Sequence, residues 1–397
     1  MIEQRIPLGT GTDPREWKQV MLAAAARGPT AIEETTEMIY VLRQREIERL
    51  LQEPRLRGVG LSLFDRMGIA DGPLREWYGA LMFTNDGAAL DRLRRLVSKA
   101  FTPRAVDRLR PVAAARVAER LSAVREAGGG DLVTAFAGVP MHVMCALLGV
   151  PAEAVPEFIA WVDALSPVFL FMEPAQIAAA TAAIAPLLAF LRELVEQRTH
   201  APADDLVTSL IRAEHDGDRL TRDETVTMVA NLLVGGHDTT ASQIGCTLLT
   251  LLGRPDALAA LRSEPSLLPA LVAETIRFEP SIAGAPRTVT QPIEICGIER
   301  PAGAVVMCSF LTANRDPAVW QDADSFRSRR FAEPSAPRLL SFGGGPHYCL
   351  GASLARMTIE EVVRGVTALA PGLTAEPDDI EWVLSLGRSP ARLPVAV

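Results

Sequence analysis

Apolar residues recur at helical spacing through the middle of the chain, from about residue 100 to residue 280. Runs of glycine or of proline with alanine, at residues 128–130 and 201–203, separate the periodic segments. This pattern predicts a set of helices over most of the chain. Two of the clearest stripes are Val112, Ala115, Val117, Leu121 and Val124, and Ile184, Leu187, Leu188, Leu191 and Leu194.

Stretches with strand character are short and lie toward both ends, at residues 38–42, 289–295, 304–308 and 382–386. Strands on either side of a long helical middle predict a mainly α fold with a small β region. No repeat or composition break divides the sequence, so a single domain over residues 1–397 is expected. Its β-rich portion should cover about 1–60, 282–310 and 375–397, and its helical portion about 64–280 and 350–366.

Charge and cysteine content narrow the class of protein. Lys and Arg total 40 against 48 Asp and Glu, a net charge of −8, which disfavours a nucleic-acid binder because neutralising phosphates requires a basic surface. The five cysteines are scattered without a CxxC pair, which fits a reducing compartment better than a disulfide framework. No apolar run reaches the ~18 residues of a membrane span. These features predict a cytoplasmic protein without a membrane span.

The segment from Phe342 to Gly351 (FGGGPHYCLG) has the most distinctive chemistry in the sequence. A glycine-rich loop precedes Cys349 and a predicted helix follows it, so the helix dipole should favour a thiolate that can ligate a metal or attack a substrate. A cysteine hydrolase with His347 as base is the weaker interpretation, because a residue two positions away in a tight loop is badly placed to take the thiol proton. The other cysteines are interpreted as buried apolar residues, namely Cys145, Cys246, Cys296 and Cys308.

This segment resembles the haem-binding signature of the cytochromes P-450, the haem-thiolate monooxygenases, at every defining position. The resemblance implies the P-450 fold, a triangular helical prism with haem b between a long central helix and the cysteine loop. It implies that Cys349 is the axial ligand of the haem iron, a ligand type that favours O–O cleavage. It also implies that Gly351 lets the backbone approach the porphyrin, that Phe342 packs beside the sulfur, and that His347 reaches a haem propionate.

Glu274 and Arg277 have the spacing of neighbours on one helix face, which by itself describes an ordinary surface pair. The resemblance implies instead a buried pair that is joined by Arg330 from a later loop. Breaking such a buried network costs roughly 3–5 kcal/mol because a charge is left unpaired. A role in folding, rather than in catalysis, is therefore expected for these residues.

A capping-box pattern at residues 221–224 predicts the start of a long apolar helix that Gly235 and Gly236 interrupt. Glycine inside a helix costs roughly 1 kcal/mol relative to alanine, so the pair indicates either close helix packing or room for a planar cofactor beside a local break. By resemblance, Asp238 and Thr239 form the acid–alcohol pair that delivers protons to bound dioxygen. His237 is interpreted as a structural or solvent-linked residue.

The resemblance also assigns cations to the haem propionates. Arg94 and Arg287 match family positions for these contacts, whereas Leu90 stands where bacterial members usually have a histidine. One propionate contact is therefore expected to differ in this chain, together with the loop that precedes Leu90.

The sequence has no flavin or iron–sulfur segment, so electrons are expected to come from separate proteins, by resemblance a ferredoxin and its NAD(P)H-dependent reductase. Basic residues outnumber Asp107 between positions 92 and 110, and they form either a solvated face or a docking patch for an acidic donor. These residues are Arg92, Arg94, Arg95, Lys99, Arg104, Arg108 and Arg110.

The positions expected to face the substrate are almost all apolar, which predicts an uncharged hydrophobic small molecule, although ordinary core is an equal interpretation of each. The predicted activity is O2-dependent hydroxylation or epoxidation by a monomeric enzyme. A peroxide-driven peroxygenase and a non-catalytic haem module that binds a gas or ligand are the alternatives. The predicted pocket residues are Leu63, Phe64, Trp77, Phe83, Phe169, Leu232, Ile282, Ala283 and Leu386.

Overall fold

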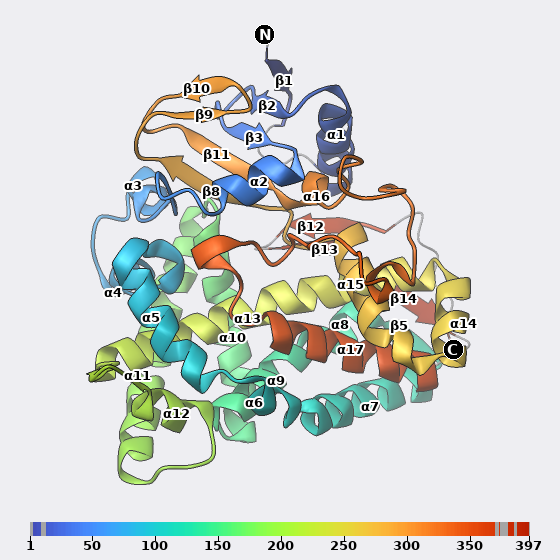
Figure 1. Cartoon of the computed structure of the whole chain (residues 1–397). Coiled ribbons are helices and arrows are strands. Elements are labelled where there is room, and N and C mark those ends of the chain that lie inside the picture. The colour runs from blue at the N-terminus through green and yellow to red at the C-terminus, as the bar shows by residue number, and fades with distance from the viewer. Residues whose placement is uncertain (1–2, 9–12, 370–372, 374–379, 385–386, 397) are drawn as a thin grey trace.

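The computed structural model describes residues 3–8, 13–369, 373, 380–384 and 387–396. A β-rich part lies at the top of Figure 1, and helices make up the rest of the molecule. The long helix α13 (Arg222–Leu252) crosses the middle of the helical part, and α17 (Ala352–Leu369) lies below it in the view. This arrangement confirms the predicted mainly α fold with a small β region.

The main sheet has the strand order β1-β2-β3-β11-β8-β4. Strand β11 runs parallel to β3 and antiparallel to β8, so that Val306 pairs with Ile39 on one side and with Arg287 on the other. Residues from both ends of the sequence thus build one sheet. Its strands are β1 (Gln4–Ile6), β2 (Thr30–Glu33), β3 (Ile39–Val41), β4 (Leu56–Arg57), β8 (Gly284–Val289) and β11 (Val305–Ser309).

The other strands form two-stranded pieces, in which β5 (Gly129–Asp131) pairs with β14 (Pro394–Ala396), β6 (Glu214–His215) with β7 (Asp218–Arg219), β9 (Ile293–Ile295) with β10 (Ile298–Arg300), and β12 (Trp382–Leu384) with β13 (Arg388–Pro390). The single strand expected over residues 289–295 is therefore wrong, because β8 ends at Val289 and β9 begins at Ile293. Pro292 stands between them and has no N–H to donate to a ladder.

The remaining α-helices are α1 (Pro14–Arg27), α2 (Gln44–Leu50), α3 (Ser62–Arg66), α4 (Pro73–Gly79), α5 (Gly87–Ala100), α6 (Pro103–Asp107), α7 (Arg110–Glu126), α8 (Leu132–Ala137), α9 (Val139–Leu148), α10 (Val155–Leu165), α11 (Pro174–His200), α12 (Leu206–Arg212), α14 (Pro255–Ser263), α15 (Leu268–Phe278) and α16 (Phe310–Ala313). Short 3-10 turns occur at η1 (Met82–Thr84), η2 (Ala152–Ala154), η3 (Ser166–Phe169), η4 (Pro265–Leu267), η5 (Arg330–Ala332) and η6 (Gly345–His347).

Helix α13 is the centre of the helical packing. The Thr221 side chain accepts a hydrogen bond from the Glu224 N–H, and the Glu224 side chain accepts one from the Thr221 N–H. The predicted capping box is therefore present. The helix packs against α8, α9, α11 and α17. The expected local break at Gly235 and Gly236 is wrong, because α13 is helical through both residues.

Helix α11 is the one described helix that is long and apolar enough to cross a membrane by itself. A third of its most apolar window is buried, and the helix packs against α4, α10, α12 and α13. The core helix of a soluble protein meets the same test of length and composition, so this finding is weak evidence for a membrane span.

Candidate active site

The cysteine loop is held by backbone hydrogen bonds and by glycines. The Gly343 N–H donates to the Leu340 carbonyl at 2.7 Å, and the Cys349 N–H donates to the Phe342 carbonyl at 2.9 Å. Gly345 has φ +60°, and a Cβ atom there would lie 2.0 Å from the backbone oxygen of Leu51. Only glycine fits both the left-handed backbone and this close approach.

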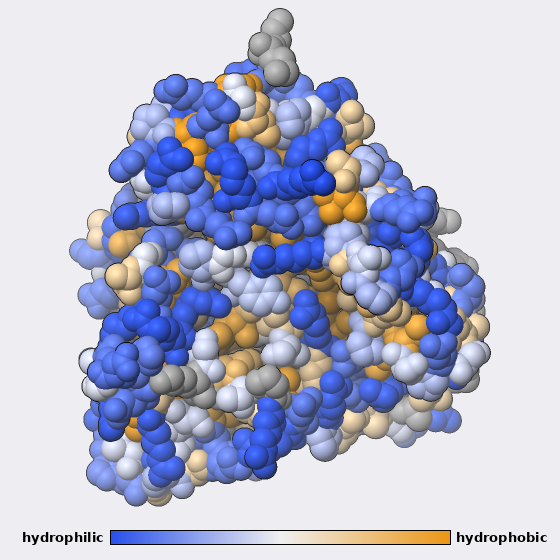
Figure 2. All heavy atoms as spheres, in the orientation of Figure 1, coloured by the Kyte–Doolittle hydropathy of each residue, from blue (hydrophilic) through white to orange (hydrophobic). Residues whose placement is uncertain are grey.

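The Cys349 side chain is exposed to solvent even though protein atoms surround it, so it lines an internal hollow rather than the outer surface. Figure 2 shows such a hollow, lined by apolar residues, below the β-rich part. Burial raises the pKa of the Cys349 thiol above its ordinary value, against the opposing effects of a Gly351 backbone hydrogen bond and the charges of Arg94 and Arg356. In the protein alone, burial therefore outweighs the expected helix-end preference for a thiolate, and a bound metal cation would be the partner that favours the deprotonated sulfur.

Two predicted glycines leave open space. A Cβ atom added to Gly235 of α13 or to Gly351 beside the cysteine would meet no other atom within 4 Å. Gly236 differs, because its Cβ would lie 3.2 Å from the Met144 sulfur of α9. Close helix packing, and not cofactor contact, therefore explains Gly236.

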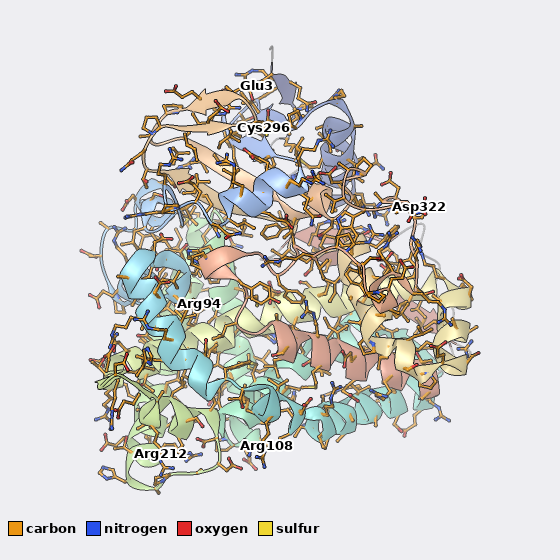
Figure 3. All side chains as sticks on the ribbon, viewed as in Figure 1. Glu3, Arg94, Arg108, Arg212, Cys296 and Asp322 are labelled. Atoms are coloured by element: carbon orange, nitrogen blue, oxygen red, sulfur yellow. The ribbon has the colours of Figure 1, made fainter. Side chains whose placement is uncertain are left out.

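Two arginines near the hollow have carboxylates only at longer range among the described residues, Asp86 for Arg287 and Asp91 for Arg94. Arg287 is 5% exposed, and its side chain donates to the Pro286 carbonyl at 2.8 Å. Within the described ranges, neither Arg287 nor Arg94 has an ion-pair partner, and burial lowers the pKa of both guanidinium groups. Figure 3 places Arg94 beside α5. Arg94 lies close enough to Cys349 for the two charges to interact.

His347 has a carboxylate partner within the protein, in addition to the propionate contact that stays a prediction. Its Nε2 atom pairs with Asp86 Oδ1 at 2.8 Å, and Asp86 also accepts from the Gly58 N–H at 3.1 Å. Leu90, one turn into α5, is buried and apolar. The loop before Leu90 thus supplies a carboxylate, that of Asp86, to the cysteine loop.

Comparison with known proteins agrees with this geometry. The family model for Cytochrome P450 matches residues 64–364. The chain belongs to the cytochrome P450 family.

Among its relatives, Cytochrome P450 107B1 of Saccharopolyspora erythraea is 34% identical over 367 residues, which cover 89% of this chain and 88% of the relative. The 6-deoxyerythronolide B hydroxylase of the same organism is 34% identical over 344 residues, covering 85% of this chain and 83% of the relative. The crystal structure of CalO2 superposes with a TM-score of 0.88 at 29% identity and covers 97% of this chain and 96% of that one. The prediction of a P450 monooxygenase on the P450 fold is confirmed.

P450 enzymes hold haem through a cysteine thiolate, and the residues around Cys349 fit that group. Haem is flat and carries two carboxylates. The open spaces at Gly235 and Gly351 lie on the two elements that should sandwich it, and Arg94 and Arg287 supply two cations without carboxylate partners. The donor set therefore matches a planar dianionic cofactor.

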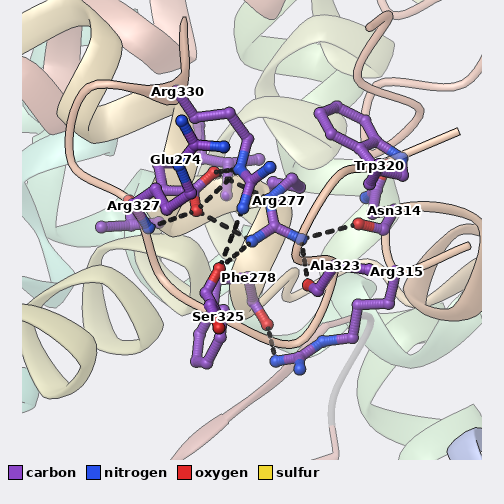
Figure 4. Close-up of polar contacts among 12 residues, drawn as sticks. Glu274, Arg277, Phe278, Asn314, Arg315, Trp320, Ala323, Ser325, Arg327 and Arg330 are labelled. Carbon is purple, nitrogen blue, oxygen red and sulfur yellow. Dashed lines mark hydrogen bonds and ion pairs between the residues drawn. The ribbon is translucent and has the colours of Figure 1, made fainter. Parts of the chain in front are cut away.

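Beneath the P450 site, Glu274, Arg277 and Arg330 are brought together in the interior (Figure 4), where both members of the first pair are 0% exposed. Arg277 makes a bidentate contact with Glu274 at 2.7 and 2.8 Å, and Arg330 Nε approaches the same carboxylate at 3.1 Å. The remaining Arg277 donors reach backbone carbonyls, among them that of Asn314 at 2.9 Å. An exposed surface pair is thereby excluded.

The predicted acid–alcohol segment of the P450 lies within α13, where Asp238 and Thr239 are both half-buried. Thr239 Oγ1 donates to the Gly235 carbonyl at 2.8 Å, and the Thr239 carbonyl accepts from Ser281 Oγ at 3.3 Å. His237 is buried and its Nε2 lies 3.2 Å from Asp163 of α10, so it links two helices.

The predicted pocket residues divide by exposure. Leu63, Phe83, Phe169, Ile282 and Ala283 are partly exposed, and the rings of Phe83 and Phe169 meet edge to face at 5.5 Å. Three other predicted pocket residues are buried, and ordinary core is the better interpretation of them. They are Phe64, Trp77 and Leu232. Leu386 lies outside the described residues.

The basic segment of the P450 is largely neutralised. Arg92 binds Asp218 and Glu224, and other pairs join Arg108 to Asp204 and Arg110 to Glu360 and Glu361. In Figure 3, Arg108 lies near α6, away from Arg94. Two exposed cations of the segment, Arg95 and Arg104, have no ion pair among the described residues, and the side chain of Lys99 is not described.

Two residues near the site were missed from the sequence. Arg356 of α17 stacks over the Phe342 ring at 4.5 Å from its centroid and acts electrostatically on Cys349. Its position two helical turns after the cysteine was an available signal. Asp86 had no signal of its own, because its partner His347 is 261 positions away in the chain.

Proposed function

We propose that this P450 binds haem b through Cys349 and uses O2 to hydroxylate or epoxidise an uncharged, hydrophobic small molecule. The observation that carries the proposal is a thiol in an internal hollow, flanked by open glycine positions and by two arginines without carboxylate partners. We further propose a monomeric enzyme in the cytoplasm.

Haem bound through a thiolate supplies the activation of O2 that the amino acids lack. The protein supplies the surroundings. Arg94 and Arg287 would pair with the haem propionates. The propionate charges would favour the charged guanidinium groups, which burial disfavours. Phe342, covered by Arg356, shields the cysteine side from water and sets the electron density at the sulfur.

On the opposite side, Thr239 and Asp238 hold and move protons. The Thr239 hydroxyl donates to the Gly235 carbonyl, so it would have to leave that acceptor in order to donate its proton elsewhere in the site. Asp238 is half-buried and is therefore reachable for reprotonation from water.

Substrate recognition is apolar in this proposal. Phe83, Phe169, Ile282 and Ala283 are partly exposed, so a hydrophobic ligand gains about 25 cal/mol for each Å² of apolar surface that it covers there. The relatives include a hydroxylase of a named small molecule, 6-deoxyerythronolide B, which supports this class of substrate without identifying it.

The first experiment tests the haem ligand. The reduced protein with carbon monoxide should show the red-shifted Soret band of a thiolate ligand, and Cys349→Ala should lose it. Cys296→Ala is the matched control, because Cys296 is a free cysteine beside the β-rich core, and it should keep the band. A band that persists in Cys349→Ala contradicts ligation by this residue.

The second experiment separates a monooxygenase from a peroxygenase. Thr239→Ala should lower the fraction of electrons that end in product, because a proton donor to dioxygen is removed. Thr250→Ala is the control, since its hydroxyl makes the same kind of backbone contact, to the Cys246 carbonyl one turn earlier in α13 at 2.7 Å. Undiminished coupling in Thr239→Ala favours peroxide use, and the absence of any oxidised product favours a ligand-binding module.

The electron donor in this proposal is a ferredoxin reduced by an NAD(P)H-dependent reductase. Arg95 and Arg104 offer exposed positive charge near α5, which raises the association rate with an acidic donor. Reversing both charges to Glu should slow reduction by ferredoxin several-fold at low salt. Arg212→Glu on α12 changes the net charge by the same amount as Arg95→Glu alone and is the control for that single variant. Equal slowing in the control contradicts a local patch.

A further inference from the structure

Asp86 occupies an unusual position at the start of α5. It is the N-cap residue of the helix, yet its side chain makes no capping hydrogen bond. N-cap aspartates usually accept from the N–H groups of their own first turn, which stabilises a helix by about 1 kcal/mol. This carboxylate instead accepts from the Gly58 N–H at 3.1 Å and from His347 at 2.8 Å.

These contacts tie together three segments that are far apart in sequence. Gly58 follows β4, Asp86 precedes α5, and His347 ends η6 in the cysteine loop. The His347 and Asp86 side chains are 15% and 20% exposed, so water screens their interaction only partly. Among the described residues, no other ion pair joins α5 or the segment before it to the cysteine loop.

The charges around Asp86 favour its ionised form. Burial alone would raise the pKa of Asp86, but the His347 contact, the Gly58 N–H and the Arg287 charge hold it below the ordinary value. Leu90, one turn further along α5, has no polar group that could replace this link. Asp86 is therefore a fixed anion at the same end of the site as Arg287.

We propose that Asp86 is a positioning residue that holds the cysteine loop against α5 through His347. The proposal rests on the haem site described above. Arg94 lies on α5, and Cys349 follows His347 by two residues. The Asp86–His347 contact therefore fixes the position of the proposed iron ligand relative to the arginine that would bind a propionate. Haem retention should depend on this link, although Asp86 itself needs no contact with haem.

The experiment measures haem release from the holoenzyme to excess apomyoglobin. Asp86→Asn and His347→Asn should each release haem about tenfold faster, because each substitution removes the charge-assisted hydrogen bond between the two segments. The double variant should be no faster than the faster single variant, since both substitutions break the same link. Asp86→Glu, which keeps the charged acceptor, should restore slow release.

Asp71→Asn is the matched control, because Asp71 is an exposed loop carboxylate before α4, and its release rate should equal that of the wild type. Hydrogen exchange of the Tyr348 and Cys349 amides gives a second readout, and Asp86→Asn should exchange them faster while far-ultraviolet circular dichroism stays unchanged.

The outcomes distinguish the two proposals. A wild-type protein without the thiolate-type carbon monoxide band refutes the haem site itself. A normal band combined with wild-type release in Asp86→Asn overturns only the role of Asp86. Additive effects in the double variant, or release from Asp86→Glu as fast as from Asp86→Asn, overturn positioning through His347.

Discussion

Two sets of arginines in this P450 differ in what neutralises them. Arg277 and Arg330 share the Glu274 carboxylate, and their other donors end on backbone carbonyls. Arg287 is buried and Arg94 is half-buried, and among the described residues neither has a carboxylate within ion-pair distance, so Asp86 and Asp91 act on them only at longer range. A buried charge is costly unless it is paired. The first set therefore stabilises the fold by itself, whereas the second set is suited to an anionic ligand.

The largest effect should come from breaking the self-neutralised set. Glu274→Ala leaves two buried guanidinium groups without their anion, which should lower the free energy of unfolding by roughly 3–5 kcal/mol. Denaturant unfolding measures this loss, together with the yield of haem-bound protein. Glu264→Ala is the control, because the Glu264–Arg329 pair is exposed and its removal should leave stability unchanged. A stable Glu274→Ala variant would contradict the distinction between the two sets.

A substitution in the second set should weaken haem binding and, at the same time, stabilise the haem-free protein. Arg287→Met removes a propionate partner, so haem should leave the holoenzyme about tenfold faster or more. The same substitution removes the cost of burying an unpartnered charge, so the haem-free protein should unfold at a higher denaturant concentration. Haem transfer to apomyoglobin and urea unfolding of the haem-free form measure the two effects. A haem-free variant that is less stable than the wild type would show that Arg287 serves the fold.

Glu279 forms a second cluster of paired charges with Lys18 and Arg388, and the stability that this cluster contributes should depend on pH. Burial would raise the pKa of Glu279, but the charges of Arg388 and Lys18 hold it below the ordinary value of 4.5. The pKa of Lys18 is itself lowered, because burial outweighs the attraction of Glu279. The geometry supports a paired cluster, since Glu279 contacts both cations.

A carboxyl with a depressed folded pKa adds stability above its unfolded pKa, and this contribution is lost as the pH falls through the folded pKa. Wild type should therefore exceed Glu279→Gln most at pH 6 and above, and the difference should shrink progressively below about pH 4.5. Urea unfolding of both proteins from pH 7 to pH 3 measures it. A constant difference across this range would show that Glu279 acts by packing rather than by charge.

The smallest effect should come from a pair with the same chemistry at the surface. Arg5 and Glu37 form a bidentate contact, but their side chains are 50% and 62% exposed. Water screens such pairs, so Glu37→Gln should leave the denaturation midpoint unchanged. A clear loss of stability would show that bidentate geometry matters more than burial.

The sequence predicted the cysteine loop and the central helix because these are local patterns, while the role of Cys349 as iron ligand came from the family resemblance and stays a prediction. The loop around Cys349 and the capping box of α13 each occupy a few consecutive residues. Spacing could not show that Glu274 and Arg277 are buried, and the family resemblance supplied that expectation. It also could not show the sign of the Cys349 pKa shift, because burial of the thiol depends on the whole fold.

Partners that are distant in sequence were not predicted. The basic segment was interpreted as a solvated face or a docking patch, and nothing in its sequence indicated that Arg92 pairs with Asp218 and Glu224, which lie more than a hundred positions later. The propionate contact assigned to His347 stays a prediction, and its carboxylate partner from the loop before α5 was not foreseen. Short strands such as β1 and β2 escaped detection because three or four residues show little alternation.

The close approach of Gly345 to Leu51 has a consequence for how the chain can be shortened. Leu51 lies before the family match begins at residue 64, yet its backbone oxygen occupies the space beside the cysteine loop. A version trimmed to the matched residues would keep every predicted haem contact and lose the wall behind the loop. The backbone at Leu51, in the N-terminal part of the chain, thus limits the conformation of the loop that carries Cys349. Protein engineering that exchanges this part between relatives should preserve the backbone at Leu51.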